Sequence, residues 1–207
     1  MNNATKIVLA SSNPGKLREI SEIFADKPYQ LIPQSEFDVC DADETGLTFV
    51  ENAILKARHA AKATGMMAMA DDSGIEVDYL KGAPGIYSAR YAGEPCDNQA
   101  NNDKLLDALQ GVPIGQRTAR FQCVIVLMRH TLDPTPLICM GTWEGWIVEQ
   151  ETGANGFGYD PLFYVPTHHC TSAELSPETK NQLSHRGQAL RELAGKFPQF
   201  LAHDTPH

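Results

Sequence analysis

Residues 6–18 read KIVLASSNPGKLR, and this stretch decides the fold class. The run 6–10 is short, apolar and rich in β-branched residues, which predicts a buried strand. Asn13 followed by Pro14 is typical of a helix start, with asparagine as the N-cap and proline at the first helical position. A strand that turns through small polar residues into a helix is the first part of an α/β unit.

The same reading extends along the chain. A capping box, Thr48 with Glu51, predicts a helix that ends at Gly65. The run MMAMA (66–70) then predicts a buried strand, with DDSG (71–74) at its carboxyl end. Further elements are expected as follows: a helix after Pro14, a strand at 29–33, a Gly/Pro-rich loop at 81–93, a helix at 97–110, an antiparallel pair of strands at 118–128 and 136–148, a Gly-rich loop at 153–164, a helix start at Ser176-Pro177, and a last helix at 186–202.

Separate βα units together with a long hairpin predict an α/β fold with a mixed β-sheet. We found no internal repeat, low-complexity tract or linker, so one domain over 1–207 is expected. The hydrophobic content of 42% is ordinary for a chain that buries a substantial core.

Composition excludes several classes of function. The net charge of -9 disfavours a broad nucleic-acid surface. The five cysteines include no C-x-x-C pair, which favours free thiols in a reducing compartment. We expect no signal peptide, and the longest strongly apolar run, 123–128, is too short to span a bilayer. A cytoplasmic protein that binds neither nucleic acid nor membrane is therefore expected.

The opening stretch has two interpretations. It lacks the Walker A motif, yet a helix start offers free backbone N–H groups and a dipole that favours an anion. Ser11, Ser12 and Asn13 add side-chain donors, and Lys16 adds a charge. A plain capped helix is the alternative, and the stretch alone does not exclude it.

Two acidic motifs could bind a cation. In DDSG, Asp71 and Asp72 need a cation or a shifted proton if they lie in a cleft, whereas an Asx turn is the alternative. Ser73 there would allow a phosphate to approach closely. The run DADETG (41–46) offers a second carboxylate for the same metal, or else a solvated acidic turn.

Two motifs near the carboxyl end could contact a nucleotide. In GFGYD (156–160), Phe157 or Tyr159 could stack on a base, and the alternative is that these aromatics fill the core. In SHRG (184–187), a forked arginine donor suits a carbonyl or phosphate acceptor, and the alternative is a surface loop.

Taken in order, the motifs resemble one family over nearly the whole chain, the inosine triphosphate pyrophosphatases. The resemblance rests on SSNPGK (11–16), ETGLTFVENAILKA (44–57), ADDSG (70–74), GAPGIYSARYAG (82–93), GFGYDPLF (156–163) and SHRGQAL (184–190). One small departure is Ser11, where the family often has threonine, which keeps the hydroxyl.

The resemblance implies a fold, a reaction and a set of site residues. The implied fold is an elongated mixed sheet flanked by helices, with the active cleft between two lobes, usually in a homodimer. The implied reaction converts ITP, dITP or XTP to the monophosphate and pyrophosphate with Mg²⁺. The implied catalytic residues are Asp72, as proton acceptor, and Lys56; the implied metal ligands are Glu44 and Asp72; the implied substrate-binding residues are Ser11, Ser12, Asn13, Pro14, Gly15, Lys16, Ser73, Phe157, Gly158, Tyr159, Asp160, Lys180, His185 and Arg186.

Base choice follows from hydrogen bonding. Hypoxanthine and xanthine present a carbonyl at position 6, where adenine presents an amino donor. A donor such as His185 or Arg186 would hydrogen-bond to the carbonyl of hypoxanthine or xanthine and would oppose the amino group of adenine. A backbone N–H near position 2 would oppose the amino group of guanine. Two other functions stay open: a nucleotide sensor without turnover, and a Maf-type pyrophosphatase that acts on modified pyrimidines. The absent Walker motif disfavours a kinase or GTPase.

Overall fold

The computed structural model describes residues 5–25 and 27–202. Their strands form one sheet in the order β2-β1-β3-β4-β5-β6-β7. The strands are β1 (Thr5–Leu9), β2 (Tyr29–Pro33), β3 (Ala68–Val77), β4 (Thr118–Met128), β5 (Leu137–Ile147), β6 (Phe163–Val165) and β7 (Cys170–Thr171). Strand β1 is parallel to β2 and β3, whereas β6 is antiparallel to β5 and β7. The predicted α/β class with a mixed sheet is confirmed.

The helices begin and end close to where local sequence signals place them. They are α1 (Pro14–Phe24), α2 (Phe49–Thr64), α3 (Asn98–Ala108), α4 (Pro177–Leu183) and α5 (His185–Ala202). The side chains of Asn13, Thr48 and Ser176 accept hydrogen bonds from the first turns of α1, α2 and α4. Helix α2 ends at Gly65 with φ 67°, the left-handed conformation that glycine adopts without strain. No helix in the part of the chain that the structure describes is long and apolar enough to cross a membrane.

The chain forms two compact units. The first draws its described residues from Met1–Asp72, Cys123–Met140 and Arg186–His207, and the second from Ser73–Gln122 and Gly141–His185. Strands β3, β4 and β5 each contribute residues to both units. The expected single domain, and the elongated shape with a cleft between two lobes, stay predictions.

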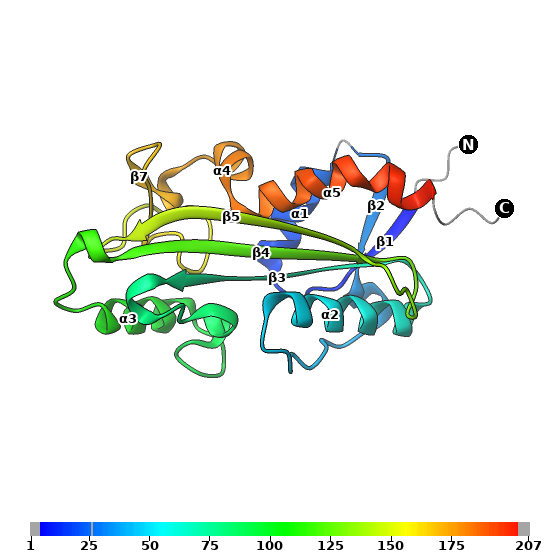
Figure 1. Cartoon of the computed structure of the whole chain (residues 1–207), viewed down its shortest axis with the longest axis horizontal. Coiled ribbons are helices and arrows are strands. Elements are labelled where there is room, and N and C mark those ends of the chain that lie inside the picture. Colours follow the sequence, from blue (N-terminus) through cyan, green and yellow to red (C-terminus); the bar gives the residue numbers. More distant parts are fainter. Residues whose placement is uncertain (1–4, 26, 203–207) are drawn as a thin grey trace. The chain divides into compact units, whose positions relative to one another are not determined.

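In the first unit, alternate residues of β1 point to opposite faces of the sheet. Ile7 and Leu9 belong to a cluster with Ile20 of α1 and Leu190 of α5. Val8 belongs to a second cluster that is rich in alanines of α2. Helices α1 and α5 therefore cover one face and α2 covers the other, as the right half of Figure 1 shows.

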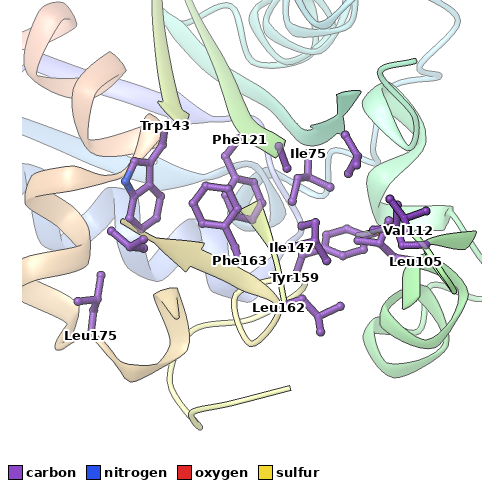
Figure 2. Packing of buried hydrophobic residues seen from close by; sticks show 14 residues of the cluster. Ile75, Leu105, Val112, Phe121, Trp143, Ile147, Tyr159, Leu162, Phe163 and Leu175 are labelled. Carbon is purple, nitrogen blue, oxygen red and sulfur yellow. The ribbon is translucent and has the colours of Figure 1, made fainter. Parts of the chain in front are cut away.

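In the second unit, a separate core is built around aromatic side chains. Phe121, Trp143 and Phe163 lie together, with ring centroids 4.6 and 5.1 Å from Phe163, as Figure 2 shows. Ile75 of β3 and Leu105 of α3 belong to the same cluster. The core holds the loop 153–162 because that loop contributes buried side chains to it.

Strand β3 corrects one expectation. We expected the strand to end before DDSG, with an Asx turn as one alternative for these residues, but the strand runs from Ala68 to Val77 and contains all four residues. Ile75 and Val77 are completely buried, so apolar alternation continues beyond the acidic pair and keeps the chain extended. A second, smaller correction is a 3₁₀ helix, Gly85–Arg90, within the loop that we expected to lack regular structure.

Candidate active site

The opening loop is a capped helix start, as one of the two interpretations required. Asn13 Oδ1 accepts hydrogen bonds from the N–H groups of Gly15 (2.9 Å) and Lys16 (3.1 Å). The Asn13 N–H itself donates to Ser11 Oγ at 3.2 Å, while Ser12 Oγ donates to Asp41 Oδ2. The loop's own side chains therefore satisfy N–H groups that we had expected to be free for an anion. Pro14 occupies the first helical position and supplies no N–H.

Asp71 lies on β3 among cations. Lys16 Nζ is 3.2 Å from Asp71 Oδ2, and Arg186 donates to the same oxygen at 3.1 Å. Burial alone would raise the pKa of Asp71, but Lys16, Arg186 and Lys56 outweigh it and hold the pKa well below its usual value. Asp71 is therefore a fixed anion that organises the lysine and the arginine.

Glu19 completes this buried network, and sequence reasoning missed it. Its carboxylate accepts a hydrogen bond from Arg186 NH1. Burial would lower the pKa of Arg186, whereas Asp71 and Glu19 raise it, so the guanidinium stays charged. Glu19 lies one helical turn after Lys16, the only signal that would have placed it beside the site.

Asp72 is in a different environment from Asp71. Lys56 Nζ bridges Asp72 Oδ1 at 2.7 Å and Glu44 Oε1 at 2.9 Å. Burial raises the pKa of Asp72 more than Lys56 and Lys16 lower it, so the net shift is upward. The pKa of Lys56 is raised too, because the three carboxylates Asp72, Asp71 and Glu44 outweigh its burial. Adjacent carboxylates with opposite pKa shifts are a pattern of acid–base sites.

The residues fit a divalent cation. Asp72 Oδ2 is buried, and no described residue supplies it with a hydrogen-bond partner. Such an orphaned carboxylate oxygen next to Glu44 is a natural Mg²⁺ ligand. Within residues 5–25 and 27–202, no group of three or more His, Cys, Asp or Glu could hold a metal by itself. A cation there would need phosphate oxygens and water to complete its shell, as Mg²⁺ commonly does.

The second unit contains the other predicted site residues. Lys180 Nζ contacts Asp160 Oδ2 at 2.5 Å and lies 5.1 Å from the centroid of the Phe157 ring. Asp160 also accepts from the Phe157 N–H (2.8 Å) and from Ser172 Oγ (2.8 Å). This buried carboxylate therefore fixes both the loop that carries Phe157 and the lysine.

The aromatics of GFGYD take different positions. The Tyr159 ring lies in the core, and its hydroxyl donates to the Ser88 carbonyl at 2.8 Å. Of the two interpretations of these aromatics, Tyr159 therefore matches the one in which the ring fills the core. Phe157 and Gly158 are only half-buried, which leaves Phe157 as the accessible aromatic of this loop. Gly158 has φ 62°, a conformation that favours glycine. Ser73 is half-buried at the start of the second unit.

His185 is buried against aromatic rings. Its ring stacks on Phe121 with centroids 4.7 Å apart and an interplanar angle of 10°. The Trp143 ring lies nearly parallel to the imidazole, with centroids 6.5 Å apart. The imidazole is thus held in one orientation by packing, which suits a group that recognises a ligand by hydrogen-bond direction.

Two half-buried lysines, adjacent carboxylates of opposite pKa shift and a carboxylate oxygen suited to a cation lie together in this α/β protein. These are the groups that a site for a phosphorylated substrate needs. Comparison with known proteins narrows the class. The Ham1 family model matches residues 7–196, and the chain belongs to that family.

Curated relatives match over most of their length. The chain is 63% identical over 188 residues to a dITP/XTP pyrophosphatase of Vibrio vulnificus (strain YJ016), covering 91% of this chain and 94% of the relative. A protein of the same name from Escherichia coli O157:H7 is 57% identical over 188 residues, covering 91% and 95%.

Solved structures agree in fold. A HAM1 protein from Coxiella burnetii has a TM-score of 0.87 at 53% identity, covering 94% of this chain and 99% of that one. The Staphylococcus aureus Ham1 protein has a TM-score of 0.82 at 46% identity, covering 97% and 100%.

Proposed function

We propose that this chain is a nucleoside-triphosphate pyrophosphatase that hydrolyses ITP, dITP and XTP to the monophosphate and pyrophosphate, and so removes non-standard purines from the nucleotide pool. The relatives named dITP/XTP pyrophosphatase, which cover 91% of this chain, support the substrate class. The observation that carries the chemistry is the pair Asp71 and Asp72, of which Asp71 contacts Lys16 and Asp72 contacts Lys56.

In the proposed reaction, water attacks the α-phosphorus and the bond from that phosphorus to the bridging oxygen breaks. Asp72 accepts the proton of the attacking water, since burial raises its pKa above the ordinary value for an aspartate. Lys16 and Lys56 place positive charge where the phosphates bind. Asp71 stays ionised and orients Lys16 and Arg186.

We further propose that Mg²⁺ is the cofactor, held by Glu44 and Asp72. A bound Mg²⁺ neutralises phosphate charge and aids departure of pyrophosphate. Because Lys56 bridges the same two carboxylates, it keeps them together before the substrate arrives. This lysine also offsets part of the carboxylate charge that would otherwise repel a triphosphate.

Base recognition is proposed for His185 with Phe157. The buried, stacked imidazole offers a fixed hydrogen-bonding edge, and Phe157 is the accessible ring of its loop. The sequence left His185 and Arg186 as alternative donors to the base, and the Arg186 guanidinium donates to Asp71 and Glu19, which favours an organising role for Arg186. A homodimer in the cytoplasm is also proposed from the family resemblance; sedimentation velocity of the purified chain tests the dimer.

The decisive experiment measures pyrophosphate release from ITP, XTP, GTP, ATP and dTTP with Mg²⁺, for the parent and for Asp72→Asn. We expect rapid release from ITP and XTP alone, reduced at least about 100-fold in the variant because the proton acceptor is lost. Asp103→Asn, on the exposed face of α3, makes the same chemical change away from the site and is the matched control. Tight ITP binding without release would identify a sensor, and release from dTTP instead would favour the pyrimidine alternative.

A further inference from the structure

The loop 41–46 carries Glu44 and is attached to the rest of the first unit at its start. Asp41 Oδ2 accepts a hydrogen bond from Ser12 Oγ at 2.5 Å, and Asp41 Oδ1 accepts one from Gln34 Nε2 at 2.6 Å. Gln34 belongs to a 3₁₀ helix (Gln34–Phe37) and is buried. A single exposed carboxylate thus joins the acidic loop to the opening loop and to the body of the unit.

The same loop is attached at its other end. Asn52 Oδ1, on α2, accepts from the Gly46 N–H at 2.8 Å, and Glu51 accepts from the Leu47 N–H at 2.8 Å. Asn52 is completely buried, and a Cβ added at Gly46 would lie 2.7 Å from Asn52 Oδ1. Glu44 lies between these two attachments and accepts a hydrogen bond from Lys56.

The sequence suggested that an acidic residue of this loop is a second metal carboxylate. In the structure both oxygens of Asp41 accept from neutral donors, whereas Glu44 accepts from the lysine that also contacts Asp72. Asp41 is therefore placed as a structural tie and Glu44 as the ligand. Since only two residues separate them, a shift of Asp41 moves Glu44 with it.

The hydroxyl of Ser12 is committed by this arrangement. A serine hydroxyl has one proton to donate, and that of Ser12 goes to Asp41. A phosphate oxygen at neutral pH needs a donor, so it cannot use this hydroxyl while the tie to Asp41 holds. Ser11 and Asn13 are not attached to the acidic loop in this way, because their side chains bond within the opening loop.

We propose that Ser12 and Asp41 form a clamp that positions Glu44 for the metal, and that the Ser12 side chain acts through this clamp rather than as a phosphate ligand. Both are positioning residues. The inference rests on the proposed function for its metal, but the clamp itself is a property of the nucleotide-free protein. Partners that orient metal ligands are worth about 10-fold or more in metal affinity in other proteins.

The experiment is a double-mutant cycle with Ser12→Ala, Asp41→Ala and the double variant. Hydrogen exchange of the amides of residues 41–47 is measured without nucleotide, and the Mg²⁺ concentration for half-maximal ITP hydrolysis is measured with it. We expect faster loop exchange and an about 10-fold higher Mg²⁺ requirement in each single variant, with no further change in the double variant.

Two controls separate the clamp from its alternatives. Ser12→Thr keeps the hydroxyl and should restore the loop protection seen in the parent. Asp43→Ala removes an equal charge from the same exposed loop and should leave exchange of the amides near Asp41 unchanged. Amides of α1 provide an internal reference for unfolding of the whole unit.

The outcomes are distinct. Additive effects of Ser12→Ala and Asp41→Ala, or a higher KM for ITP in Ser12→Ala without faster loop exchange, would make Ser12 a direct phosphate ligand and overturn the clamp. A parent chain that releases no pyrophosphate from any triphosphate would overturn the proposed function alone, because loop exchange still decides whether the clamp exists.

Discussion

At the residue scale, Asp71 and Asp72 are adjacent carboxylates whose pKa values are shifted in opposite directions by the fold. The cations around Asp71 lower its pKa, whereas burial dominates at Asp72 and raises its pKa. Sequence reasoning identified the pair but could not divide their roles. The division depends on Lys16 and Arg186, which lie far from β3 in the chain and meet Asp71 only after folding. No local pattern predicts such a contact.

This difference predicts that removing the charge of Asp71 destabilises the protein far more than removing the charge of Asp72. Asp71→Asn leaves half-buried Lys16 and buried Arg186 with less compensating negative charge, so we expect the free energy of unfolding at pH 7 to fall by about 3 kcal/mol. Asp72→Asn removes a charge that burial disfavours and leaves Lys56 paired with Glu44, so we expect the free energy of unfolding to change by no more than about 1 kcal/mol. Urea unfolding of both variants measures the difference.

The pH dependence has a definite sign. The pKa of Asp71 is lowered by folding, so its contribution to stability is present above the ordinary value of 3.8 and is lost as pH falls through the folded-state pKa. The difference in the free energy of unfolding between the parent and Asp71→Asn should therefore become smaller below about pH 4. Equal losses for Asp71→Asn and Asp72→Asn at pH 7 would contradict the assignment.

At the element scale, local signals predicted helix starts and ends well, and missed the length of β3. Asn13, Thr48 and Ser176 act within a few residues of themselves, so a reader of the sequence can see both the cap and its target. The acidic pair in β3 looks like a turn, because in isolation two carboxylates favour solvent. Lys16 and Lys56, supplied by α1 and α2, make the buried strand possible.

The hairpin between β4 and β5 offers a second test at this scale. Asp133 is buried there and accepts hydrogen bonds from the Arg129 backbone N–H (3.0 Å), the Arg129 guanidinium (2.7 Å) and the Thr135 N–H (3.0 Å). Burial opposes its ionisation, but these donors lower the pKa of Asp133 to about 2. We expect Asp133→Asn to destabilise the protein at pH 7 by about 1–3 kcal/mol.

Melting temperatures of parent and Asp133→Asn between pH 7 and pH 2.5 check this expectation. A lowered pKa means that the stabilising contribution is present above pH 3.8 and is lost progressively toward pH 2. The melting temperatures of the parent and Asp133→Asn should therefore become more similar as the pH falls through that range. A gap that stays constant down to pH 2.5 would show that the charge of Asp133 does not stabilise the hairpin.

At the scale of the whole molecule, three strands contribute residues to both units. The two tryptophans, Trp143 and Trp146, both belong to the second unit. Because the backbone of β3, β4 and β5 is shared, we expect the units to unfold in one cooperative transition, as the predicted single domain requires.

Denaturant unfolding followed by two probes measures this cooperativity. Tryptophan fluorescence reports the second unit alone, and far-UV circular dichroism reports the helices, most of whose residues lie in the first unit. Coincident transitions support one domain. A fluorescence midpoint that differs from the dichroism midpoint would show that the units unfold separately, and would contradict the single-domain prediction.

The first unit is built from three separate stretches of the chain, and the ribosome synthesises the last of them long after the first. Glu19, Asp71 and Arg186 form one buried network, yet a ribosome delivers the arginine long after the two acids. Until Arg186 and the rest of α5 are synthesised, the nascent chain lacks the guanidinium that joins Glu19 to Asp71, and one face of β1 has only α1 of its two covering helices. Completion of this network therefore has to wait for synthesis of α5, and a chain truncated before Arg186 would be exposed to proteases and chaperones as an unfinished fold.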